Sequence, residues 1–338
     1  MFVSSGSTAN LLLVASVIER YALQKNDKVI VPATTWVTNV NPIMQLGLKP
    51  IFCDIDLKNY SFDLEHLKKL AEKHPDIKMV FTTHLLGVPA PVDEYKKILP
   101  NAIFIDDVCE AQGSVSEDMM RVGANSLGAT YSFYFGHHMS TVEGGMIATN
   151  DTDLYDMMKV KRSHGMSRVS DYVDGWNAMY ADLNIDPQFL FVTDGYNFRN
   201  TELAAMLGRR QLKRINKSVR IRRERYTEYY ELLEKYEKLF HMPEFSYGNS
   251  CFCFPFIMKD KKMKNVLVTA FKLYGIEYRP IVGGNLLKQP YLLHIKTKAP
   301  NADILHENGV YIGCNQFTTA GNMKTLDEIL GRVYNEFF

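Results

Sequence analysis

Short runs of apolar and β-branched residues alternate with amphipathic stretches along the first two thirds of the chain. The pattern predicts strands at residues 27–33, 49–55, 78–84, 102–107, 129–135 and 145–150. Residues 9–24, 61–74 and 91–99 place apolar side chains at helical spacing instead. This alternation is typical of a mainly parallel sheet flanked by helices, so we predict an α/β fold for this part of the chain.

The last third follows a different pattern. A long, highly charged helical stretch is predicted over residues 199–239. Strands at 251–258 and 276–280 and helices at 263–275 and 324–338 come after it. We therefore predict a large domain over residues 1–215 and a smaller C-terminal α+β domain over residues 216–338. The only long irregular stretch is expected at residues 165–196.

Charge and composition exclude several classes of protein. Lysine and arginine number 39 against 38 acidic residues, so the net charge of +1 predicts neither nucleic acid nor an anionic membrane as a partner. The apolar run "LLLVASVI" is too short to span a bilayer, and we expect a cytoplasmic protein. Five scattered cysteines favour reduced core thiols, and their spacing predicts no metal site.

Ligands of open α/β sheets bind at the carboxyl ends of the strands, where several candidate residues fall. In "SSGSTAN", Gly6, Ser7 and Thr8 run into a helix and offer N–H and hydroxyl groups to a phosphate, although a simple helix cap explains them too. Trp36 in "PATTWVTN" could stack on a flat heterocycle or merely pack. Asp107 in "FIDDVCEAQG" ends a buried strand, where it could pair with a protonated pyridine nitrogen or cap the next segment.

Together with Ser132 and Asn197, these residues indicate a pyridoxal 5'-phosphate (PLP) site, because that cofactor needs a phosphate anchor and a carboxylate. The order "SGST", Trp36, Asp107, "SFYFGH" and "YNFR" resembles the nucleotide-sugar aminotransferases of the type I PLP-dependent fold over nearly the whole chain. The resemblance implies phosphate contacts from Ser132 and, across a homodimer with shared sites, from Asn197. It also places Glu110 beside the phenolic oxygen of the ring.

The chain departs from that family at one position. The resemblance places the Schiff-base lysine at His137, and an imidazole cannot form that covalent link. The cofactor, as PLP or pyridoxamine 5'-phosphate (PMP), is therefore expected to bind without a covalent bond, with His137 as the catalytic base. His138 is interpreted as a turn residue or a supporting partner.

With a histidine in place of that lysine, the chain is similar to the 3-dehydratases that remove a hydroxyl from 4-keto-6-deoxy sugar nucleotides. It implies a GDP-linked 4-keto-6-deoxy sugar as substrate, L-glutamate as amino donor and a role in colitose-type deoxysugar biosynthesis. His164, Arg168, Arg199 and Glu277 are the expected sugar-nucleotide contacts, with ordinary ion pairs as the alternative for the arginines.

Two other functions stay open. One is a perosamine-synthase-like 4-aminotransferase with a different base, and the other is an inactive homologue that only binds a nucleotide sugar. Members of the family also carry a further segment before the loop at Gly6, and we expect that segment to be missing here.

Overall fold

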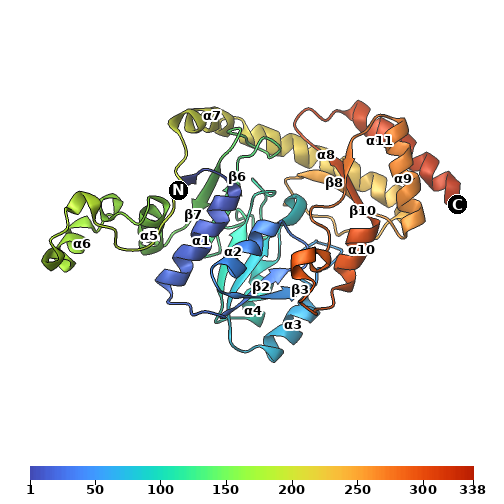
Figure 1. Cartoon of the computed structure of the whole chain (residues 1–338). Helices are drawn as coiled ribbons and strands as arrows, with labels where there is room; N and C mark the ends of the chain where they lie inside the picture. The colour runs from blue at the N-terminus through green and yellow to red at the C-terminus, as the bar shows by residue number, and fades with distance from the viewer.

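The computed structural model describes all 338 residues. Its larger unit is built on a seven-stranded sheet in the order β1-β7-β6-β5-β4-β2-β3, with helices over both faces (Figure 1). Neighbouring strands from β6 to β3 are parallel, whereas β7 is antiparallel to both β6 and β1. The strands are β1 Phe2–Val3, β2 Lys28–Pro32, β3 Lys49–Cys53, β4 Ile77–Thr83, β5 Ile103–Asp107, β6 Gly128–Ser132 and β7 Gly145–Ala148. The predicted α/β fold with a mainly parallel sheet is confirmed.

Helix α1 lies against β6 and β7, toward the β1 edge of the sheet, and is buried along most of its length. Ser5 caps its first turn, and the apolar run that follows packs on β6 and β7 with almost no exposed surface. The helices are α1 Gly6–Arg20, α2 Asn41–Gln45, α3 Leu64–Lys73, α4 Val92–Ile98, α5 Thr152–Arg162, α6 Val173–Met179, α7 Glu202–Leu212, α8 Ile215–Lys235, α9 Lys261–Leu273, α10 Pro300–Asn308 and α11 Ala320–Phe337. None of them combines the length and apolarity needed to cross a membrane.

The second unit contains a three-stranded antiparallel sheet in the order β8-β10-β9. Its strands are β8 Cys253–Ile257, β9 Tyr278–Arg279 and β10 Gly309–Gly313. Residues of α8, α9 and α11 join this sheet in a separate, aromatic-rich core. Helix α8 runs from the larger unit to the smaller one (Figure 1). The two sheets lie on either side of residue 216, and the division into domains at that residue stays a proposal.

Several predicted elements were wrong in detail. The strand expected to reach residue 135 ends at Ser132, because the chain turns back and the Thr141 N–H bonds to the Phe133 carbonyl. The long helix breaks between Leu212 and Ile215, although no proline or glycine marks the break. The stretch expected to be irregular contains α6, and β1 and β10 were not predicted.

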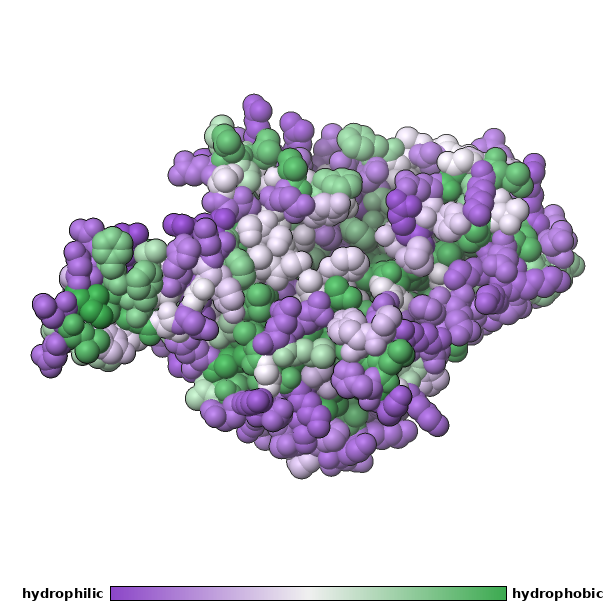
Figure 2. Space-filling model, in the orientation of Figure 1, coloured by the Kyte–Doolittle hydropathy of each residue, from purple (hydrophilic) through white to green (hydrophobic).

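Residues 172–191, which we call the arm, project from the body of the larger unit (Figure 1). The arm carries exposed apolar side chains, and Figure 2 shows hydrophobic surface there and over α7. Its exposed large residues are Tyr172, Met179, Leu183, Ile185, Phe189 and Phe191. On α7, Leu203, Met206 and Leu207 are exposed at helical spacing.

Phe256 of β8 is fully buried, and its ring lies 5.5 to 5.9 Å from those of Tyr229, Phe240 and Phe271. We expect Phe256→Ala to lower the free energy of unfolding by about 3–5 kcal/mol, because it leaves a cavity in the smaller core. Phe317→Ala is the matched control, since that ring is 77% exposed and should change stability by less than about 0.5 kcal/mol. Urea unfolding followed by circular dichroism would measure both, and equal losses would contradict this account of the core.

Candidate active site

The start of α1 forms one wall of the site. The Ser5 hydroxyl accepts the Thr8 N–H (3.1 Å), and the Thr8 hydroxyl accepts the Ser5 N–H (3.0 Å). The N–H groups of Gly6 and Ser7 belong to the first turn and have no partner within the helix, so they are available to an anion. A Cβ on Gly6 would lie 2.7 Å from the Cβ of Ser132, so glycine lets the helix approach the end of β6. The motif therefore caps the helix through Ser5 and Thr8, and it also leaves the N–H groups of Gly6 and Ser7 free to donate hydrogen bonds.

The carboxylate of Asp107 stands at the end of β5 and is only 4% exposed. Asn10 Nδ2 donates to it at 3.1 Å and the Cys109 N–H at 2.8 Å. No lysine or arginine forms an ion pair with it, so its charge is buried without a cation from the chain. A positively charged ligand atom would supply that partner. Asn10 was not predicted, although a polar residue one turn beyond Gly6 in an apolar helix was a usable signal.

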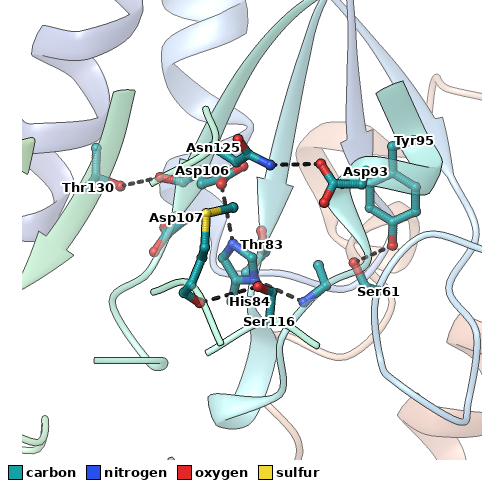
Figure 3. Close-up of polar contacts among 12 residues, drawn as sticks. Ser61, Thr83, His84, Asp93, Tyr95, Asp106, Asp107, Ser116, Asn125 and Thr130 are labelled. Carbon is teal, nitrogen blue, oxygen red and sulfur yellow. Dashed lines mark hydrogen bonds and ion pairs between the residues drawn. The ribbon is translucent and has the colours of Figure 1, made fainter. Parts of the chain in front are cut away.

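The preceding residue, Asp106, belongs to a different contact. Its Oδ2 lies 3.4 Å from Nε2 of His84, which follows β4, and both side chains are 1% exposed (Figure 3). The Nδ1 atom of His84 accepts the Ala90 N–H at 2.9 Å, so the ring proton is on Nε2 and faces the carboxylate. This pair fixes the turn after β4. It links residues 22 apart in sequence, and the pattern of residues gave no sign of it.

Glu110 lies beside that same turn. Its Oε2 accepts the N–H of Leu86 at 2.8 Å, and Leu86 has a φ of 59° in the left-handed region. Burial raises the pKa of Glu110 to about 7, and the Leu86 N–H opposes the rise. The carboxyl group therefore changes its protonation near neutral pH. It can accept a hydrogen bond from a ligand oxygen when ionised and donate one when protonated.

His137 occupies the turn after β6. Neither of its ring nitrogens is hydrogen-bonded within the chain, and the buried Nδ1 has no partner. The ring centroid lies 5.5 Å from that of Phe252. Burial lowers the pKa of His137 to about 4, the Asp107 carboxylate opposes this, and the Arg222 guanidinium adds to it. The imidazole is thus neutral at pH 7 and able to accept a proton.

The predicted substrate residues form a second, more exposed group. Arg199 Nε lies 3.2 Å from Asn197 Oδ1, and its Nη2 lies 3.5 Å from His164 Nε2. Arg168 is exposed in a short 3₁₀ turn, and Glu277 is exposed and pairs with Arg279. The structure thus brings His164 and Arg199 together with Asn197, the predicted phosphate ligand, and leaves Arg168 and Glu277 apart from them. Trp36 is 55% exposed, and its stacking role stays a prediction.

The aminotransferase family described as DegT/DnrJ/EryC1/StrS matches residues 1–330 of this sequence. The chain belongs to this family. Its resemblance to the nucleotide-sugar aminotransferases and the predicted type I PLP-dependent fold are confirmed by that match and by solved structures of similar proteins.

Among the members of the DegT/DnrJ/EryC1/StrS family, the chain is 33% identical to the GDP-4-keto-6-deoxy-D-mannose 3-dehydratase of Escherichia coli O55:H7, covering 98% of this chain and 87% of that protein. A crystal structure of a GDP-4-keto-6-deoxymannose-3-dehydratase mutant with bound GDP-perosamine matches with a TM-score of 0.89 at 32% identity, covering 98% of this chain and 87% of the other. A structure of the same enzyme with a trapped PLP-glutamate geminal diamine matches with a TM-score of 0.88, at the same identity and coverage.

Gly145 of β7 gives a test of the phosphate loop. A Cβ at this position would lie 2.1 Å from the Ser5 carbonyl oxygen and 2.8 Å from the Gly6 nitrogen. We expect Gly145→Ala to displace the loop and weaken PLP binding by about tenfold or more, which is 1.4 kcal/mol. Gly175→Ala on the arm is the matched control, since nothing lies within 4 Å of its Cβ. Absorbance titration with PLP measures both, and equal affinities would contradict a phosphate site at this loop.

Proposed function

We propose that this chain is a PLP- and PMP-dependent 3-dehydratase of a GDP-linked 4-keto-6-deoxy sugar. The observation that carries the proposal is His137, a neutral imidazole without a hydrogen-bond partner, at the position that the family resemblance assigns to the Schiff-base lysine. The names and structures of the similar proteins support the same chemistry.

The residues at the strand ends fit the cofactor. The free N–H groups at the start of α1 suit a phosphate, and Ser132 lies against Gly6 at the same place. The buried carboxylate of Asp107 suits a protonated ring nitrogen, and the titratable Glu110 suits a phenolic oxygen. When bound, the cofactor supplies an electron sink through its pyridine ring.

His137 carries the proton transfers in this proposal. Because its ring is neutral at pH 7, it can take a proton from a carbon atom and later give it to a departing hydroxyl. No lysine is hydrogen-bonded or ion-paired to His137, Asp107 or Glu110. The buried Lys161 pairs instead with Glu19 and Asp194. This arrangement disfavours the aminotransferase alternative, which needs a lysine beside the cofactor.

Glutamate restores the amine form of the cofactor in this proposal, and the sugar loses its C3 hydroxyl, so that ammonia and a 3-deoxy keto sugar are released. The cytoplasm is the proposed location, and colitose-type deoxysugar biosynthesis is the proposed context. The exposed group of His164, Asn197 and Arg199 is proposed to bind the diphosphate or a partner's cofactor phosphate.

The direct test is incubation of the purified chain with GDP-4-keto-6-deoxymannose, glutamate and PLP. We expect ammonia and a 3-deoxy product by mass spectrometry. His137→Asn should lower turnover by about 10²–10⁴-fold, because it removes the proton carrier. His294→Asn, at an exposed histidine, is the control and should leave turnover unchanged. For the wild type, the loss of kcat/KM that arises from protonation of His137 should have its midpoint at about pH 4, because protonation removes the base.

Other outcomes of this experiment favour the alternatives. An amino sugar as product would support the 4-aminotransferase, and no turnover with no absorbance change on adding glutamate would support the inactive homologue. Borohydride should leave PLP unattached to the wild type and attach it to a His137→Lys variant, since only lysine forms a reducible imine. Attachment to the wild type would contradict an untethered cofactor.

We also propose that the chain works as a homodimer in which α7 lies at the interface. Leu203, Met206 and Leu207 are 74%, 64% and 46% exposed on one face of that helix. This face follows directly after the segment that carries Asn197 and Arg199, so a second copy seated on it could receive these side chains in its own site.

We expect the wild type to have twice the mass of the chain in light scattering at micromolar concentration. Leu203→Glu combined with Met206→Glu should give the monomer mass, because two charges would be buried in the interface. Leu273→Glu is the control, since that side chain is 80% exposed on α9, away from α7. A monomeric wild type, or an unchanged mass in the double variant, would contradict the proposed interface.

A further inference from the structure

His138, beside the proposed base, is buried and makes specific contacts of its own. It is 5% exposed, and its Nε2 lies 2.9 Å from the carbonyl oxygen and 3.0 Å from the hydroxyl oxygen of Ser250. A carbonyl oxygen only accepts hydrogen bonds, so Nε2 must carry the ring proton. Burial lowers the pKa of His138 well below its usual value, which keeps the ring neutral and its proton on that nitrogen.

The hydrogen bonds continue from Ser250 into the larger unit. Its hydroxyl lies 2.9 Å from that of Ser114, which donates to the Gly87 carbonyl at 2.7 Å. The Ser250 N–H also donates to the Ser114 hydroxyl at 3.1 Å. Both serines are completely buried. The chain of bonds therefore joins the turn after β6, the loop after β5, the turn after β4 and the segment that precedes β8.

Phe252 lies two residues beyond Ser250. Its ring centroid is 5.5 Å from that of His137 and 6.1 Å from that of His138. Its N–H donates to the Leu86 carbonyl at 3.1 Å, so its backbone is also held by the turn after β4. A displacement of Ser250 would move this ring away from His137 and admit water to one face of the imidazole.

We propose that His138 is a positioning residue whose bond to Ser250 holds Phe252 against His137 and so fixes the orientation and the dehydration of that imidazole. The role in catalysis rests on the proposed function, whereas the role in holding His137 does not. The charged groups that face His137 are Asp107 from β5 and Arg222 from α8. Neither is altered in the variants below.

The test compares His138→Leu, which lacks the donor, with His138→Gln, whose amide N–H can reach the same acceptor. In protein labelled with ¹⁵N-histidine, the His137 signals of the substrate-free wild type should not titrate between pH 5.5 and 8, because its pKa is about 4. His137→Asn assigns those signals. In His138→Leu we expect His137 to titrate inside this range, about two pH units above the wild type. His138→Gln should restore the wild-type behaviour.

The same shift should appear in the acid limb of kcat/KM if the proposed dehydratase activity exists, with kcat reduced more than KM is changed. An NMR shift in a protein without turnover would support this inference and contradict the proposed function. Folded His138→Leu with an unshifted His137 would overturn the inference. If that variant does not fold, Phe252→Leu decides, because it removes the aromatic wall alone. An unshifted His137 in Phe252→Leu would overturn the inference equally.

Discussion

The buried carboxylate of Asp107 is the constraint on which the rest of the site depends. A charge at the end of a buried strand is costly, and here only two N–H donors from the chain offset it. One of those donors is Asn10 in α1, so the carboxylate also fixes how that helix approaches the sheet. The helix start, the end of β6 and the loop after β5 therefore surround the space into which a cationic ring nitrogen would have to come.

Two titratable groups around this space, His137 and Glu110, have pKa values shifted in opposite directions. Burial lowers the pKa of His137 and raises that of Glu110, so at neutral pH one is a neutral base and the other lies near its midpoint. Both shifts arise from the same cause acting on groups of opposite charge type. The site thus contains a neutral base, His137, and a carboxyl group that gains or loses a proton near neutral pH, Glu110. Both lie close to the carboxylate of Asp107.

The sequence predicted the parts of the site that local pattern controls. Strand ends, the capped start of α1 and the unusual His137 could all be read from neighbouring residues. The contacts that support them could not be read in this way, since His84 to Asp106 and His138 to Ser250 join segments 22 and 112 residues apart. Arg222 illustrates the same limit. It lies in the highly charged helical stretch predicted over residues 199–239, yet its side chain is 3% exposed and donates to the carbonyls of Cys251 and Cys314.

Helix α8 is hydrogen-bonded to both units of the chain. Arg222 bonds to carbonyl groups of the smaller unit, and the next residue, Arg223, donates to the Gly113 carbonyl of the larger one at 2.9 Å. A Cβ on Gly113 would lie 2.5 Å from a methyl group of Val219, so the helix also rests directly on that loop. Sliding of the smaller unit along the α8 axis would break these bonds and press on the loop. Helix α8 therefore resists displacement of one sheet relative to the other, in addition to the bonds that join Ser250 to the loop after β5.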